Sequence, residues 1–163
     1  MAKVVTADEA VAQIKDGASV LVVPMPSEEV YPAFNRVFEA TGHPKNLTML
    51  HPIAAGDMSG IKGIDHVAKE GLLGRIIAGS YPSGPSSAEP PAIWKMIGDS
   101  AVPAYNIPSG ILFDMHREAA AKRPGVITKV GLDTFADPRR HGCAMNAAAA
   151  SEPVVEVIDF RGE

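Results

Sequence analysis

The chain of 163 residues contains a single cysteine, Cys143, and few aromatic side chains, which make up 6% of its residues. One cysteine excludes an internal disulfide framework and is typical of proteins in a reducing cytoplasm. No apolar run is long enough to cross a bilayer, and Met1 leads into a helix start without the features of a signal peptide. These absences favour a cytoplasmic location and no membrane partner.

The chain also lacks an excess of basic residues, because 15 Lys and Arg stand against 19 Asp and Glu, a formal net charge of -4. A nucleic-acid partner is therefore not expected, since such proteins need a basic face. Hydrophobic residues form 46% of the chain, enough for one globular core, so we expect a single domain over 1–163. The 15 glycines and 14 prolines gather between the periodic segments, which favours many ordered loops over disorder.

Short apolar runs alternate with helical patterns along the chain. The runs predict strands at residues 19–23, 46–51, 75–79, 103–107 and 154–160, and residues 126–130 fit either a strand or an extended loop edge. The patterns predict helices after Thr6 and at residues 31–40, 64–71, 92–97 and 111–121, and a linker or short helical turn at 147–150. This alternation predicts an α/β fold: a three-layer, doubly wound and mostly parallel sheet with helices on both faces.

Local signals mark several ends of these elements. Thr6 and Glu9 have the spacing of a capping box, and Gly17 and Gly42 each end a helical pattern. The expected last strand, 154–160, has no later strand to pair with, so the sheet lacks its last strands. Such a strand is an exposed sheet edge unless another chain covers it. We therefore expect an oligomer, or a domain that is incomplete without a partner or further polypeptide.

In parallel α/β sheets, ligands bind beyond the carboxyl ends of the strands, here residues 23–28, 51–57, 79–85 and 106–110. Ser109 lies in this region, where a serine is more often the N-cap of the following helix than a catalytic group. Glu28 and Glu29 could act as a catalytic base, but negative charges that complement the dipole at a helix start are the commoner role. His51 is open to a ligand contact or to a buried structural role.

Other polar side chains favour ordinary roles. His66 and Glu70, four residues apart, suit a structural helical pair better than a metal site, and His141 with Cys143 lacks further ligands, so we expect no metal. Arg139 and Arg140 fit either phosphate contacts or a solvated loop. Asp137 before a proline is typical of a turn.

Motifs in order along nearly the whole chain resemble the amino-terminal half of a family I coenzyme A transferase, of the propionate and short-chain acyl-CoA:acetate type. The matching segments are residues 6–10 (TADEA), 14–17 (IKDG), 41–48 (TGHPKNLT), 66–73 (HVAKEGLL), 75–79 (RIIAG), 104–106 (AYN), 124–131 (PGVITKVG) and 134–139 (TFADPR), with Asn146 after them. The ordered set is specific, although no single motif decides the assignment.

The resemblance implies exchange of coenzyme A between a short-chain acyl-CoA and a free carboxylic acid. In the family, a glutamate of the carboxy-terminal half attacks the thioester and becomes a glutamyl-CoA thioester, which is covalent catalysis by a carboxylate. The nucleophile is then absent from this chain, and a carboxy-terminal half or beta-type subunit is the implied partner. Coenzyme A is a substrate, and no cofactor is implied.

Two departures from the family pattern concern the oxyanion site. The family's first loop resembles Gly-Phe-x-Gly-x-x-Pro-Glu, whereas residues 23–32 read VPMPSEEVYP, whose prolines remove backbone N–H donors. Ser109 replaces a glutamine that donates to the oxyanion, and losing one such donor typically costs about a hundredfold to a thousandfold in rate. Residues 80–82 (SYP) also differ from the usual His-Trp.

The candidate site residues are therefore Ser109 as an oxyanion donor and, for substrate binding, Met25, Pro26, Ser27, Glu28, Asn106, Ser109 and Gly110. Two other functions stay open. One is an acyl-CoA hydrolase or lyase on the same scaffold, and the other is a non-catalytic interaction subunit whose oxyanion site has decayed.

Overall fold

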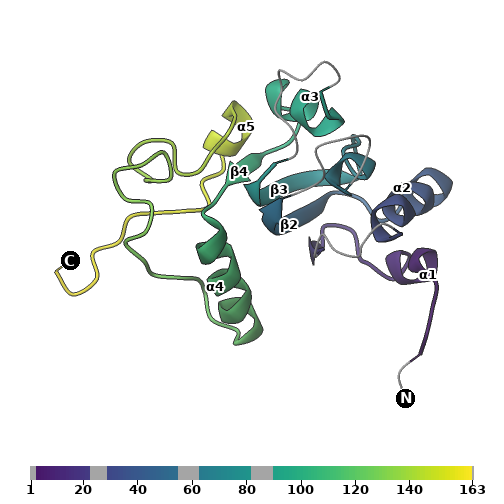
Figure 1. Cartoon of the computed structure of the whole chain (residues 1–163), viewed down its shortest axis with the longest axis horizontal. Helices are drawn as coiled ribbons and strands as arrows, with labels where there is room; N and C mark the ends of the chain where they lie inside the picture. Colours follow the sequence, from purple (N-terminus) through teal and green to yellow (C-terminus); the bar gives the residue numbers. More distant parts are fainter. Residues whose placement is uncertain (1–2, 23–28, 55–62, 82–89, 163) are drawn as a thin grey trace.

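The computed structural model describes residues 3–22, 29–54, 63–81 and 90–162. Within these residues, four parallel strands form one sheet in the order β1-β2-β3-β4 (Figure 1). The strands are β1 (Ser19–Leu21), β2 (Leu47–Ala54), β3 (Leu73–Ser80) and β4 (Ala104–Asn106). The parallel sheet confirms the α/β class that the alternation predicts.

Helices cover both faces of this sheet. They are α1 (Ala7–Val11), α2 (Val30–Thr41), the 3₁₀ turn η1 (Gly63–His66), α3 (Ala92–Gly98), α4 (Ser109–Ala120) and α5 (Ala147–Ala150). The connections that contain α2, η1 and α3 pack on one face, whereas α4 packs against β2 and β3 from the other. The result is three layers, with all three strand crossovers on the same side.

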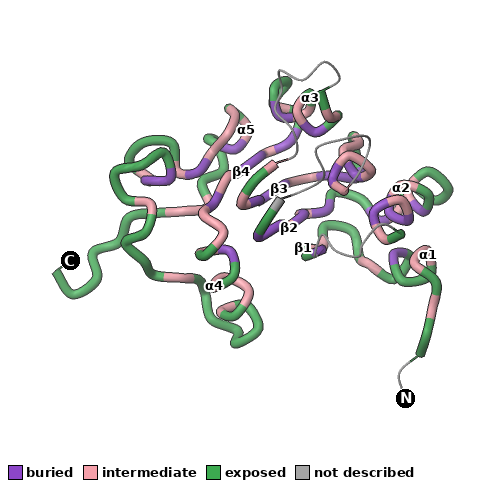
Figure 2. The backbone as a smooth tube through the Cα atoms, viewed as in Figure 1, coloured by how far each residue is buried: buried purple, intermediate pink, exposed green. Residues whose placement is uncertain are grey.

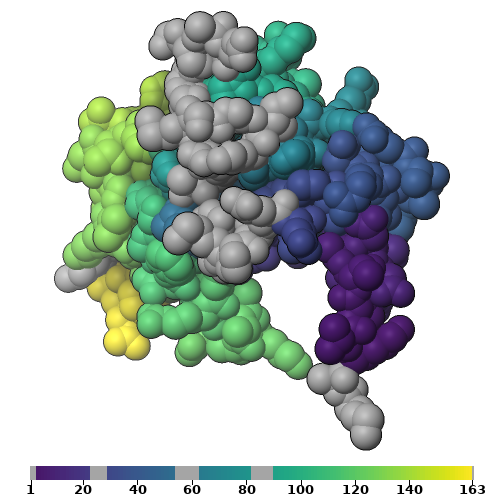
Figure 3. Space-filling model, turned by 45° about the vertical axis from the view of Figure 1, so that its right-hand side comes forward, coloured from purple at the N-terminus to yellow at the C-terminus, as the bar shows by residue number. Residues whose placement is uncertain are grey.

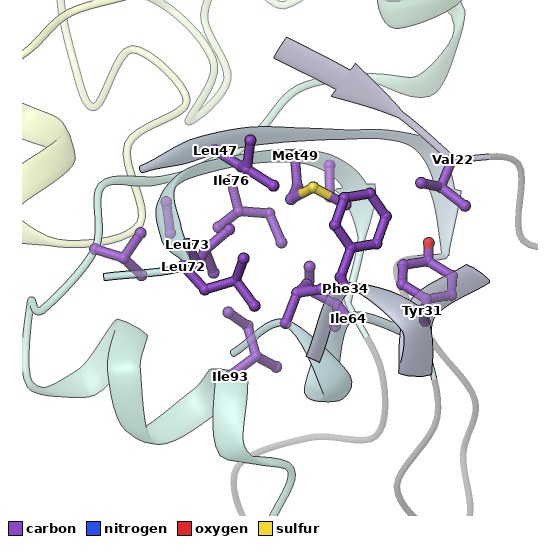
Figure 4. Close-up of a cluster of buried hydrophobic side chains, with 14 of the residues drawn as sticks. Val22, Tyr31, Phe34, Leu47, Met49, Ile64, Leu72, Leu73, Ile76 and Ile93 are labelled. Carbon is purple, nitrogen blue, oxygen red and sulfur yellow. The ribbon is translucent and has the colours of Figure 1, made fainter. Parts of the chain in front are cut away.

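The register of the strands explains how the two faces divide the core. Successive side chains of a strand point to opposite faces, and Met49, Ile76 and Ala104 lie opposite one another in the cluster that α2 and α3 cover. Figure 4 shows the centre of this cluster, with Phe34 of α2 lying beside Met49. The next register position carries Ile77 and Tyr105, which belong to the smaller cluster with Leu112 of α4.

The helix signals of the amino-terminal half are confirmed. The hydroxyl of Thr6 accepts from the backbone N–H of Glu9, and the carboxylate of Glu9 accepts from the N–H of Thr6, so the capping box is complete. Gly42 ends α2 with a φ of +69°, in the left-handed region that glycine adopts without a steric penalty.

Two expected elements differ from the structure, and one open alternative is decided. The helix expected at 64–71 is only the four-residue turn η1. The carboxylate of Asp65 in this turn accepts from the backbone N–H groups of Ala92 and Ile93 at the start of α3. Residues 126–130 form a loop, as the second of the two expected alternatives has it. Residues 154–160 form no strand, because alternation alone does not make one without a neighbour to supply hydrogen bonds.

Apart from α5, residues 121–162, the C-terminal segment, run as turns and loops beside the sheet, and they are largely exposed in Figure 2. The segment joins the sheet next to β4, where the N–H of Asn106 donates to the carbonyl of Cys143 and the N–H of Met145 donates to the carbonyl of Ala104. Cys143 is buried, and burial raises the pKa of its thiol to about 11. Among the described residues, no helix combines the length and apolarity needed to span a membrane.

Candidate active site

The carboxyl ends of β2, β3 and β4 meet the start of α4 at one edge of the sheet. A side chain on Gly79 would place its Cβ 2.2 Å from the Ser109 hydroxyl oxygen and 2.3 Å from the carbonyl oxygen of Pro52. Glycine is therefore required at this point of β3, because both oxygens occupy the space that any side chain would take. Residues of β2, β3 and α4 are therefore in close contact beside Ser109.

Ser109 is the first residue of α4 and is half-buried. The expectation that it is the N-cap is wrong, because Pro108 takes that position and provides no side-chain cap. The N–H groups of Ile111 and Leu112 both donate to the carbonyl of Pro108. Among the described residues, nothing forms a hydrogen bond with the Ser109 hydroxyl, which leaves it free to donate at the edge of the sheet. Gly110 follows on the exposed side of the same turn.

Asn106, the last residue of β4, is held in place by its own amide. Its Nδ2 donates to the carbonyl oxygens of Ala78 at 3.1 Å and Gly79 at 2.9 Å. Both hydrogens of the amide nitrogen are thereby used, so the side chain can offer a ligand its oxygen, an acceptor, but no donor. At this edge, Asn106 can thus offer an acceptor and Ser109 a donor.

His51 of β2 is fully buried, and its Nδ1 lies 3.0 Å from the hydroxyl oxygen of Tyr31 in α2. The two rings stack with centroids 5.8 Å apart. Burial lowers the pKa of His51 to about 4 and raises the pKa of Tyr31 well above its usual range. Both side chains are therefore uncharged at neutral pH.

Four of the candidate residues, Met25, Pro26, Ser27 and Glu28, lie outside the described residues. Glu29, which follows them, is exposed at the N-cap position of α2 and makes no side-chain cap. A negative charge at this end of the helix is favourable.

The other polar candidates separate in space. His66 ends η1 whereas Glu70 lies in the following turn, so the two do not share a helix. No three metal-ligating side chains come together in the part of the chain that the structure describes. Asp137 forms the expected turn, in which the Arg139 guanidinium and nearby backbone N–H groups hold the pKa of its carboxyl well below the usual range. This ion pair occupies Arg139 within its own loop.

A cleft of about 360 Å³ lies in the C-terminal segment and not at the strand ends. Arg140, His141, Met145 and Asn146 are among the residues that line it, whereas neither Asn106 nor Ser109 does. In the space-filling view the elements of this side, coloured green and yellow, lie opposite α1 and α2 (Figure 3).

The family model named coenzyme A transferase matches residues 4–163, which is nearly the whole chain. The chain belongs to the coenzyme A transferase family. This assignment confirms the family that the sequence motifs resemble.

Two curated relatives carry transferase names. The chain is 39% identical over 167 residues to caffeate CoA-transferase of Acetobacterium woodii, covering all of this chain and 30% of the relative. It is 30% identical over 162 residues to the acetate CoA-transferase YdiF of Escherichia coli K12, covering 96% of this chain and 29% of the relative. The chain thus spans about a third of the length of these transferases.

The solved structures agree with this placement. The crystal structure of the acyl-CoA transferase YdiF of E. coli O157:H7, as a thioester complex with CoA, matches with a TM-score of 0.80 and 28% identity, over 98% of this chain and 30% of that one. The apoenzyme of the same protein matches with a TM-score of 0.78. The chain therefore has the fold of one part of a coenzyme A transferase.

Proposed function

We propose that this chain is the amino-terminal half of an acyl-CoA:carboxylate CoA-transferase. It would move coenzyme A between a short-chain acyl-CoA and a free carboxylic acid, together with a carboxy-terminal half or a beta-type subunit. The observation that carries the proposal is the match of nearly the whole chain to about 30% of relatives named as CoA-transferases. To carry out the activity of those relatives, this chain would then need a further part of the enzyme.

The chemistry of the proposal divides between the two parts. The other part would supply the glutamate that attacks the thioester carbonyl carbon, so that negative charge develops on the carbonyl oxygen. Preorganised donors at that oxygen lower the barrier because they are already in place when the charge forms. In this chain, the Ser109 hydroxyl at the start of α4 would be such a donor. Gly110 and the acceptor oxygen of Asn106 would line the acyl pocket, with Met25, Pro26, Ser27 and Glu28 as further contacts.

The exposed apolar side chains of the C-terminal segment support the need for a partner. Phe135, Val157 and Phe160 each expose about half of their surface. We propose that the carboxy-terminal half covers them in an oligomeric enzyme of short-chain fatty acid metabolism. This enzyme would be cytoplasmic, with coenzyme A as substrate and no prosthetic group.

The first experiment tests the reaction. The chain is produced together with its carboxy-terminal half, and the intact mass of the co-purifying polypeptide is measured. Loss of acyl-CoA is then followed with and without added acetate. Loss that requires acetate is expected. Loss without an acceptor would instead show a hydrolase or lyase, and no loss in either case would favour the non-catalytic subunit.

A second experiment tests the proposed role of Ser109. Ser109→Ala is expected to lower kcat by about a hundredfold to a thousandfold, the usual effect of removing one oxyanion donor. Ser19→Ala is the matched control, because Ser19 is an exposed serine at the opposite, amino end of β1. Equal rates for the two variants would remove Ser109 from the oxyanion site. Ser109→Gln, which restores the family's residue, is expected to raise the rate if the site has decayed.

A further inference from the structure

His51 is a buried polar residue that the proposed transfer chemistry leaves without a role. It lies in the carboxyl-terminal half of β2 and is fully shielded from solvent. An imidazole carries two ring nitrogens, and placing both in the protein interior is costly unless each has a hydrogen-bond partner. The surroundings of the two nitrogens therefore indicate what this side chain does.

The first nitrogen, Nδ1, is satisfied by Tyr31. The Tyr31 hydroxyl is itself buried and has no other hydrogen-bond partner among the described residues, so its proton needs Nδ1 as acceptor. Because the imidazole is uncharged at neutral pH, a lone pair on Nδ1 places the ring proton on Nε2. Tyr31 thus fixes the tautomer in which Nε2 is a donor.

The second nitrogen, Nε2, is buried and has no hydrogen-bond partner among the described residues. Leaving a buried donor unpaired destabilises the folded state, so such groups are rare and call for a physical reason. One such reason is that the donor binds a ligand oxygen, because the ligand then supplies the missing hydrogen-bond acceptor.

His51 shares a face of the sheet with Asn106 of the strand-end site, whereas the Ser109 hydroxyl lies beside Gly79 on the opposite face. His51 lies opposite Ala78 of β3, and Ala78 lies opposite Asn106 of β4, so all three are in one row across the sheet. Residues opposite one another share a face, and this row is close to the carboxyl edge where α/β proteins bind ligands. Since the amide hydrogens of Asn106 are already used, the Nε2 proton of His51 is an unused donor on this row.

We propose that His51 is a substrate-binding residue whose Nε2–H donates to an uncharged carbonyl oxygen of the acyl-CoA. This inference rests on the proposed function. Two groups of the substrate carry such an oxygen, namely the acyl thioester and the amides of the pantetheine arm. An uncharged donor suits an uncharged acceptor, since no ion has to be desolvated. Because Nε2 is covered, its neighbours have to move aside when the ligand enters.

The direct test follows the histidine proton. The chain, assembled with its carboxy-terminal half and labelled with ¹⁵N-histidine, is titrated with free coenzyme A and separately with acyl-CoA, and the Nε2–H resonance is recorded by NMR. A shift with both ligands identifies a pantetheine carbonyl as the acceptor, and a shift with acyl-CoA alone identifies the thioester carbonyl. No shift with either ligand, as expected for a histidine bonded only to buried water, would overturn the proposal.

Kinetics provide the second test. His51→Phe keeps an aromatic ring but removes the donor, and it is expected to raise KM for acyl-CoA at least tenfold. His51→Gln places an amide N–H near the position of Nε2 and is expected to restore most of that loss. His43→Gln is the matched control, because His43 is a partly exposed histidine that pairs with Asp16 away from the strand ends. Equal KM values for His51→Phe and wild type would contradict the proposal.

The two hypotheses fail separately. If wild-type enzyme transfers coenzyme A and the His51 resonance and KM do not respond, only the role of His51 is wrong. If the resonance responds to acyl-CoA but no transfer occurs, the binding role stands and the proposed reaction is wrong. Should His51→Phe fail to fold, the titration of wild-type enzyme still decides between these outcomes.

Discussion

Residues 3–120 and the C-terminal segment differ in how far they bury their apolar side chains. In the first region, Phe34, Met49 and Ile76 are almost completely buried between helices and sheet. In the segment, Ile127 and Val130 are more than 60% exposed. Figure 2 shows the contrast as a buried interior on one side and an exposed tube on the other.

The segment adds only a few small buried side chains to the cluster around Tyr105 and Leu112, and polar contacts position much of the rest. Asn146 caps α5 through Oδ1, and its Nδ2 donates to the carbonyl oxygens of Ile97 and Val102. Asp137 accepts from the backbone N–H of Asp133 and from Arg139. The difference teaches that extensive hydrophobic burial fixes the first region, whereas the second combines limited burial with individual hydrogen bonds and leaves several of its large apolar side chains exposed.

The largest expected effect comes from truncating a core side chain. Phe34→Ala removes a ring that is 1% exposed, so it should lower the free energy of unfolding by about 3–5 kcal/mol. Phe135→Ala, in the segment, removes a ring that is 47% exposed and should change it by less than about 0.5 kcal/mol. Equilibrium urea unfolding of both variants measures the difference. Similar losses would break the comparison between the regions.

Mild acid, between pH 7 and pH 4.5, should act mainly on the first region. The pKa of His51 is about 4 in the folded chain, against 6.5 for an unperturbed histidine, so the unfolded chain binds the proton more tightly. The contribution of uncharged His51 to the free energy of unfolding is complete above pH 6.5. It is lost as the pH falls from 6.5 to 4, by up to about 3 kcal/mol at 1.36 kcal/mol for each pKa unit. Urea unfolding at pH 7 and pH 4.5 measures this loss. The pH dependence should be shallower for His51→Phe, and an unchanged slope would contradict the prediction.

A methyl group at Gly79 should have a smaller effect. Gly79→Ala forces the Ser109 hydroxyl and the Pro52 carbonyl apart, and overpacking of this kind costs about 1–3 kcal/mol. Gly98→Ala is the control, because nothing lies within 4 Å of the Cβ position there. Thermal unfolding compares the two. Combining Gly79→Ala with Ser109→Ala should recover only part of the loss, since the Pro52 carbonyl remains.

The smallest of these effects concerns the attachment of the segment. Asn146→Ala removes the cap of α5 and two bonds to the loops around α3 and β4, for an expected loss of about 1–2 kcal/mol. Hydrogen exchange should accelerate at residues 143–150 and stay unchanged in β2 and β3. Faster exchange throughout the sheet would show that the two regions unfold as one unit.

The sequence was sufficient to predict the elements whose signals are local. The capping box at Thr6, the stop at Gly42 and the buried runs of β2 and β3 all depend on neighbouring residues. The strand expected at 154–160 failed because a strand depends on a partner elsewhere in the chain. The N-cap expected at Ser109 failed because Pro108 already occupies that position.

The site was less predictable because it depends on register. Gly79, Pro52 and Ser109 meet only after three strands are aligned, and no spacing along the chain signals this. Likewise, His51 and Tyr31 are 20 residues apart and meet because α2 packs on β2. Sequence analysis could name Asn106 and Ser109 as candidates, but the consumed amide of Asn106 and the free hydroxyl of Ser109 became evident only from their neighbours.

The buried thiol of Cys143 provides a means of timing local opening. With a pKa of about 11, only about 0.1% of this thiol is ionised at pH 8, and ionised thiol is the form that alkylating reagents attack. Cys143 is also the only cysteine of the chain, so a single mass increment marks each modified molecule. The rate at which iodoacetamide modifies Cys143 would therefore measure how often residues 136–145 separate from β4.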